Sequence, residues 1–213
     1  NKIRIIHRGV DPARYYHGYI PSVEWMNRWN LEHAALKDQF LVTLPARITR
    51  WKGHDDFIEI IAGLRAKNIP AHGLLAGDAH PRRKRYVEEL KNRIGTKGLD
   101  HHITFLGHCN DMREIMSVSD VVLSLAKVPE AFGRTALEAL ALDIPVVAYD
   151  HGGASEVLAG MFPKGKVKPF DIQGVVKTIT DLYQQPEKPG TETPFTLDRM
   201  LEQVITLYEE IMR

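Results

Sequence analysis

From residue 40 to residue 183, runs typical of buried strands alternate with segments typical of core-facing helices. The strand runs are aliphatic or β-branched; the segment at 54–67 carries apolar residues at i, i+3, i+4 and i+7, and 172–183 carries another amphipathic stripe. The expected strands lie at 40–44, 73–76, 103–106, 121–125, 144–148 and near 164–167, and the expected helices at 54–67, 86–94, 112–118, from about 133, and 172–183. This order predicts an α/β fold, a Rossmann-like parallel sheet of about six strands with helices on both faces.

The two ends of the chain depart from this pattern. IRII at 3–6 predicts a short strand, and residues 23–36 predict a helix in which Trp25 and Trp29 share one packed face. Residues 184–194 are rich in proline and charge, which indicates an exposed link. The last helix, at 197–212, has an apolar stripe that must pack against another surface.

The stretch PEAFGRTALEALALDIPVVAYDHGGASEV, at 129–157, is the main candidate ligand site. Glu130 precedes a tight turn, a helix from about Gly133 carries Glu138, and a Gly-Gly loop follows at 152–153. The positive N-terminus of a helix suits a phosphate. Glu138 would lie roughly 7–8 Å along the helix, where its carboxylate can bind two vicinal hydroxyls. Spacing alone leaves open that Glu130 only complements the helix dipole and that Glu138 is solvated.

The loop after the first expected strand, PARITRWKG, adds two cations at the sheet edge where open α/β folds bind ligands. Arg47 and Lys52 suit a diphosphate, although two solvated loop cations would have the same sequence. The adjacent His101 and His102 do not predict a metal site, because neighbouring residues on a strand point to opposite faces.

EAFGRTALEALALDIPVVAYDHGGASEV closely resembles the nucleotide-binding motif of the group 1 (family 4) retaining glycosyltransferases, which have a two-domain B-type fold. The match includes the E-x7-E spacing of that family, here at Glu130 and Glu138, and the resemblance covers most of the chain from about Gly9 to Glu156. It implies that the chain is the C-terminal, nucleotide-sugar-binding part of a longer enzyme.

The same resemblance implies a division into three parts. We expect residues 1–38 to be an inter-domain crossover segment and helix, and 39–184 to be the Rossmann-like donor-binding domain. Residues 185–213 would be a linker and a C-terminal helix that packs back toward a missing N-terminal domain.

The resemblance assigns catalytic roles to three residues. Arg47 and Lys52 match paired basic residues that hold the nucleotide phosphates and the developing leaving-group charge, and Glu130 faces the sugar. The residues expected to bind the nucleotide sugar are Gly77, Leu106, His108, Cys109, Phe132, Gly133, Arg134, Thr135 and Glu138.

Within that set, the resemblance implies separate tasks. The backbone of Phe132 and Gly133 would meet sugar hydroxyls, that of Arg134 and Thr135 would meet phosphate, and Glu138 would hold the ribose. Arg134 stands where the family usually has an aliphatic residue, so it adds a phosphate contact or only a surface charge. The base pocket would include Leu106, His108 and Cys109, and the glycine at position 77 would permit close backbone approach.

The implied function is transfer of a sugar from a UDP-, GDP- or ADP-sugar to a hydroxyl acceptor in glycan, lipopolysaccharide or glycolipid synthesis. The resemblance implies a retaining, hexosyltransferase-like enzyme without cofactor or metal, and we expect this part alone to bind nucleotide weakly and catalyse little. The alternatives are a sugar-nucleotide 2-epimerase of the same architecture, a dinucleotide-dependent oxidoreductase and a non-catalytic binding domain. Against the oxidoreductase, no G-x-G-x-x-G turn follows the first strand.

Composition limits the classes of partner that the chain can bind. The net charge of +1 at pH 7 gives no case for nucleic acid, and the single cysteine, Cys109, fits a cytoplasmic protein. We find neither an apolar run as long as a membrane span nor a signal peptide. The basic run at 82–85 is expected to be solvated, with contact to phospholipid at the inner membrane face as the alternative.

Overall fold

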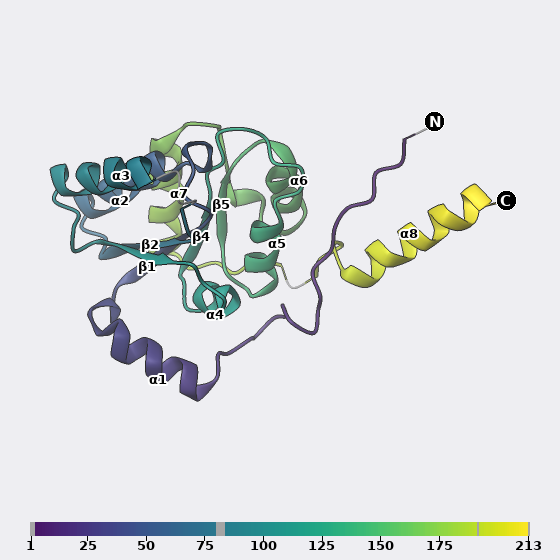
Figure 1. Cartoon of the computed structure of the whole chain (residues 1–213), viewed down its shortest axis with the longest axis horizontal. Coiled ribbons are helices and arrows are strands. Elements are labelled where there is room, and N and C mark those ends of the chain that lie inside the picture. The colour runs from purple at the N-terminus through teal and green to yellow at the C-terminus, as the bar shows by residue number, and fades with distance from the viewer. Residues whose placement is uncertain (1–2, 80–83, 191, 213) are drawn as a thin grey trace.

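The computed structural model describes residues 3–79, 84–190 and 192–212, and its centre is a six-stranded sheet in the order β3-β2-β1-β4-β5-β6 (Figure 1). Every neighbouring pair of strands is parallel. The strands are β1 (Phe40–Pro45), β2 (Ala71–Ala76), β3 (Ile103–Gly107), β4 (Val121–Ser124), β5 (Val146–Tyr149) and β6 (Lys166–Val167). The prediction of a parallel α/β sheet of about six strands is therefore confirmed.

Helices cover both faces of the sheet. The described α-helices are α1 (Val23–Glu32), α2 (His54–Ala66), α3 (Lys84–Thr96), α4 (Met112–Ser117), α5 (Arg134–Ala141), α6 (Gly152–Met161), α7 (Ile172–Gln184) and α8 (Leu197–Met212), of which α8 lies away from the sheet. On one face α2 packs against α3 and α7, and on the other α5 packs against α4 and α6 (Figure 1). The predicted apolar stripe of α2 is fully buried and consists of Phe57, Ile60, Ile61 and Leu64.

The strand order creates a switch point between β1 and β4. The chain runs outward from β1 through β2 to β3, and then returns to the other side of β1 to form β4 and β5. The loops that leave β1 and β4 therefore diverge, and a crevice opens at their carboxyl ends, where ligands of such sheets bind.

Two local predictions were wrong, and a third rested on a wrong premise. Among the described residues, 3–9 belong to no strand, and only Val10 forms a bridge, to Thr196. The predicted Gly-Gly loop at 152–153 is instead the first turn of α6. His101 and His102 lie in the turn before β3, so the argument from strand geometry does not apply to them.

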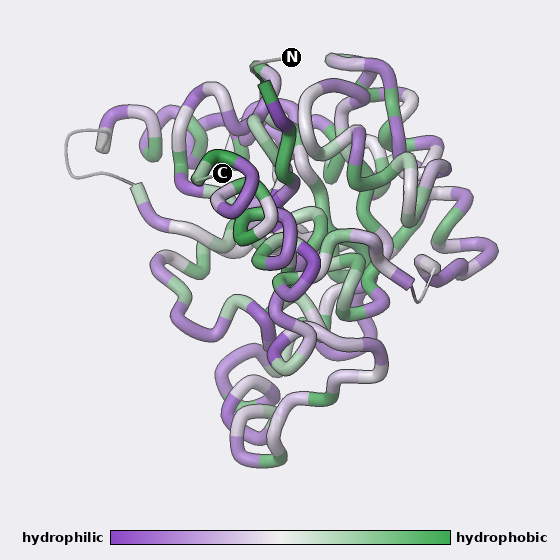
Figure 2. Tube along the Cα trace, turned by 90° about the vertical axis from the view of Figure 1, so that its right-hand side faces the viewer, coloured by the Kyte–Doolittle hydropathy of each residue, from purple (hydrophilic) through white to green (hydrophobic). Residues whose placement is uncertain are grey.

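The N-terminal segment and α8 project together from the sheet (Figure 1). Arg4 Nη2 lies 2.7 Å from Glu210 Oε2, and within the described part of α8 no residue is buried. Figure 2 shows hydrophobic positions in both segments. None of the described helices is long and apolar enough to cross a membrane.

The segment that contains α1 packs differently from these ends. The rings of Trp25 and Trp29 stack with centroids 5.1 Å apart and are buried against Leu41, Leu74 and Ile115. The predicted packing role of the two tryptophans is therefore confirmed.

Two buried histidines predict a loss of stability in mild acid. Burial lowers the pKa of His54 and that of His72 to about 4, from an ordinary value of 6.5. Between about pH 6.5 and 4 the unfolded chain therefore binds more protons than the folded chain. As the pH decreases through this range, the free energy of unfolding falls by roughly 1.4 kcal/mol per pH unit for each histidine. Urea denaturation at several pH values should show that His72→Gln reduces this slope, whereas His101→Gln, at an exposed site, should not. An unchanged slope in His72→Gln would contradict the prediction.

Candidate functional site

A cavity of about 220 Å³ lies at the switch point, between the carboxyl ends of β1 and β4. Its walls include Lys52 from the loop after β1, Glu130 from the loop after β4, and the first residues of α5, Arg134 and Thr135. A cation, a carboxylate and a helix N-terminus thus meet in one cavity.

A second, more open hollow of about 500 Å³ adjoins this cavity and shares Pro45 and Ala46 with it. It lies over the carboxyl ends of β1, β2 and β3, and its lining includes Arg47, Gly77, His108 and Cys109. The two hollows form a continuous edge along which an elongated ligand can lie.

Lys52 and Glu130 form an ion pair, in which Lys52 Nζ donates to Glu130 Oε1. Their side chains are only 18% and 25% exposed, so the attraction is weakly screened by water. Lys52 ends the short 3-10 helix Arg50–Lys52, and its Nζ lies 4.4 Å from the centre of the Trp51 ring. In this structure the two charges neutralise each other beside the N-terminus of α5.

The turn that carries Glu130 rests directly on two glycines. The Gly153 N–H donates to the Glu130 carbonyl at 2.8 Å, and a Cβ at Gly153 would lie 2.2 Å from the Phe132 Cα. A Cβ at Gly152 would lie 2.7 Å from the Glu130 backbone nitrogen. The glycine pair therefore lets α6 support this turn, a role that the sequence prediction missed although the adjacent glycines after a strand were visible.

The N-terminal end of α5 faces the first cavity. Gly133 precedes the helix with φ of 74°, a conformation that glycine adopts without steric cost. Because glycine has no side chain to cap the helix, the first-turn N–H groups remain available, and they carry the positive end of the helix dipole. This end suits an anionic group.

Glu138 lies farther along α5, outside the linings of both hollows. Its side chain is 15% exposed, and its Oε1 is 3.4 Å from the Nε of Arg134. Burial raises the pKa of Glu138, while Arg134 and Arg14 oppose that rise. Burial and, after it, the charge of Glu138 raise the pKa of Tyr15, so residues of the N-terminal segment lie near Glu138.

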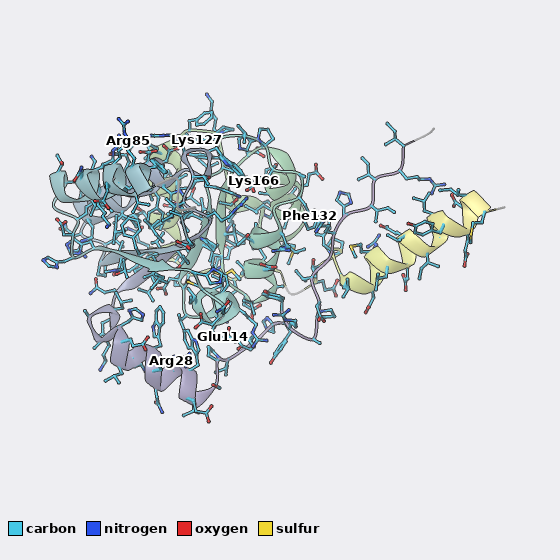
Figure 3. The ribbon with its side chains drawn as sticks, viewed as in Figure 1. Arg28, Arg85, Glu114, Lys127, Phe132 and Lys166 are labelled. Carbon is cyan, nitrogen blue, oxygen red and sulfur yellow. The ribbon has the colours of Figure 1, made fainter. Side chains whose placement is uncertain are left out.

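Two other predicted residues also lie outside the hollows. Phe132 packs edge-on against Phe195, with centroids 5.9 Å apart, where the N-terminal segment meets the sheet domain (Figure 3). Leu106 and Cys109 pack against the buried cluster around Trp25 and Trp29. Burial raises the pKa of the Cys109 thiol. The structure thus brings together nine of the twelve predicted positions, lining one hollow or the other: Arg47, Lys52, Gly77, His108, Cys109, Glu130, Gly133, Arg134 and Thr135.

Two further features concern ions and membranes. Across the described ranges, no group of three or more His, Cys, Asp or Glu side chains is placed to hold a metal ion. In the basic run at 82–85, Arg82 and Arg83 lie outside the described residues, while Arg85 Nε is 3.3 Å from Glu89 Oε1. Contact of this run with a membrane stays a prediction.

Two curated proteins are similar to this chain. The chain is 30% identical to the mannosylfructose-phosphate synthase of Agrobacterium fabrum, in an alignment that covers 97% of this chain and 47% of that protein. It is 32% identical over 114 residues to the lipopolysaccharide core biosynthesis mannosyltransferase LpsB of Rhizobium meliloti, covering 54% of this chain and 32% of LpsB. The chain thus spans at most about half the length of these curated relatives.

A solved structure shares the fold. The crystal structure of Anabaena Alr3699/HepE in complex with UDP superposes with a TM-score of 0.84 at 24% identity, covering 97% of this chain and 57% of that one. The family model described as "Glycosyl transferases group 1" matches residues 27–191, which is well over half of the chain. The chain therefore belongs to the group 1 glycosyl transferases.

Proposed function

We propose that this chain is the donor-binding part of a retaining glycosyltransferase, which moves a sugar from a nucleoside-diphosphate sugar to a hydroxyl acceptor in glycan, lipopolysaccharide or glycolipid synthesis. The observation that carries the proposal is the cavity in which Lys52, Glu130 and the start of α5 meet. Family membership and the UDP named for the HepE complex support the same donor class.

The two hollows suggest how the donor lies. The diphosphate occupies the first cavity, between Lys52 and the N–H groups of α5, with Arg47 at the border of the second hollow. The base extends into that second hollow, beside Gly77 and His108. The base is that of UDP, GDP or ADP.

The chemical step is departure of the diphosphate from the anomeric carbon of the sugar. The electron pair of the breaking bond goes to the diphosphate oxygen, and Lys52, Arg47 and the helix N–H groups stabilise the charge that gathers there. The acceptor hydroxyl oxygen forms the new bond to the anomeric carbon, and its proton goes to the departing diphosphate oxygen. Lys52 exchanges its partner Glu130 for the phosphate, which frees the Glu130 carboxylate to stabilise the positive character of the sugar. These groups do the work of a divalent metal, so we propose that none is needed.

The acceptor is held mainly by an N-terminal domain that packs against α8 and residues 3–6. Exposed apolar side chains on both segments support this placement: Ile3, Ile5, Leu201, Ile205, Tyr208 and Ile211. We place the enzyme in the cytoplasm, with contact at the inner face of a membrane, on the sequence arguments alone.

Calorimetry with UDP, GDP, ADP and NAD tests the proposal. We expect the chain to bind one of the three diphosphates and not to bind NAD. Binding of none of the three would contradict the proposal and favour a non-catalytic binding domain. An assay of the complete enzyme for acceptor glycosylation, rather than for epimerised donor, separates it from a 2-epimerase.

Glu138→Ala should weaken nucleotide binding by about 10- to 150-fold. A carboxylate that accepts hydrogen bonds from ribose hydroxyls contributes roughly 1.5–3 kcal/mol, which corresponds to that factor. The control is Glu59→Ala, because Glu59 is also helical and instead pairs with Lys97 at 2.9 Å. Titration curves that coincide for the wild type and Glu138→Ala would remove the ribose role.

A further inference from the structure

A buried carboxylate links the loops that carry the candidate site. Asp56, in the first turn of α2, is 8% exposed. Its Oδ2 accepts a hydrogen bond of 2.7 Å from the Tyr149 hydroxyl, and its Oδ1 lies 2.9 Å from Lys127 Nζ (Lys127 is labelled in Figure 3). Tyr149 is fully buried at the end of β5.

Each partner of Asp56 leads to a residue of the site. Lys127 shortly precedes Glu130, and its backbone N–H donates to the carbonyl of Trp51, the neighbour of Lys52, at 2.6 Å. Tyr149 begins the connection to the glycine pair that supports the Glu130 turn. Asp56 therefore joins the first turn of α2, the loop after β4 and the end of β5.

We propose that Asp56, Lys127 and Tyr149 form a positioning network that fixes Lys52 and Glu130 for the diphosphate sugar. The inference rests on the proposed function. Its physical basis is that a buried carboxylate is costly without partners, so neither loop can move away without leaving Asp56 under-satisfied. Such links hold a site to the tolerance that binding and catalysis require.

The neighbouring residue on α2 provides a matched control. Asp55 Oδ2 accepts a hydrogen bond of 2.8 Å from the Tyr86 hydroxyl, and its Oδ1 lies 3.0 Å from Arg93 Nη1. This arrangement has the same chemistry, but it joins α2 to α3 instead of to the loops after β4 and β5.

The test compares Tyr149→Phe with Tyr86→Phe. Each substitution removes one hydrogen bond from a tyrosine hydroxyl to a carboxylate, so we expect both to lower the melting temperature by a similar amount. Only Tyr149→Phe should weaken binding of the diphosphate that the wild type prefers among UDP, GDP and ADP, by about 5- to 30-fold in calorimetry. A second pair of variants tests the charge of Lys127. Lys127→Arg should keep the affinity for the diphosphate, and Lys127→Met should lose it.

The outcomes separate the two proposals. If the wild type binds a diphosphate but Tyr149→Phe and Tyr86→Phe bind it equally well, the network only stabilises the fold and the inference fails alone. If the wild type binds none of the three, the proposed function fails and the inference with it. Should Tyr149→Phe not fold, equal affinities of Lys127→Arg and Lys127→Met would overturn the inference.

Discussion

Lys52→Met is expected to reduce turnover by the complete enzyme about 100- to 1,000-fold, which is the typical effect of removing one group that stabilises transition-state charge. The ammonium lies in the cavity beside the start of α5, so it is placed to meet the leaving diphosphate as charge develops. Methionine keeps a chain of similar length against the Trp51 ring, and the change therefore removes charge more than packing. Steady-state kinetics of the two enzymes measure the effect.

Lys97→Met is the matched control for this experiment. Lys97 is also a partly exposed lysine in an ion pair, with Glu59 at 2.9 Å, but it lies just beyond α3 and away from both hollows. It should keep turnover within about twofold, as expected for a surface pair of small energetic weight. A Lys52→Met enzyme that resembled this control would show that the leaving group is stabilised elsewhere.

The sheet could be predicted from the sequence because its central strands, β2, β1, β4 and β5, are largely buried on both faces. Such strands are continuous apolar runs, and the stripe on α2 identifies the helix that covers them. The strand expected at 3–6 did not form, since pairing depends on a neighbouring strand that local sequence cannot specify. Gly152 and Gly153 begin a helix although glycine has poor helix propensity, and the close contact with Glu130 and Phe132, which leaves no room for a Cβ, explains why glycine occupies both positions.

The candidate site was predictable to a similar extent. Position after a strand was enough to predict that Lys52, Glu130 and the start of α5 share one edge of the sheet. The ion pair between Lys52 and Glu130 was not predicted, because both were expected to face a ligand. The contacts of Asp56 with Tyr149 and Lys127 join residues that are distant in sequence, and no local motif marks them.

Glu130→Gln is expected to separate binding from catalysis. The carboxylate lies beside the position proposed for the diphosphate and also competes for Lys52. Removing its negative charge relieves repulsion and frees the lysine, so nucleoside-diphosphate affinity should hold or rise by a few-fold. Turnover should fall by about 100-fold or more, because the positive character of the sugar in the transition state loses its stabilising charge.

Calorimetry on the chain and kinetics on the complete enzyme measure these two effects. Glu156→Gln is the control, since Glu156 is an exposed carboxylate on α6 that pairs with His7 at 3.2 Å. If the affinity holds or rises while turnover falls, Glu130 acts on the sugar and not on the phosphates. A parallel loss of both would mean that its role is to hold Lys52 in place, and the carboxylate facing the sugar would then have to come from another residue.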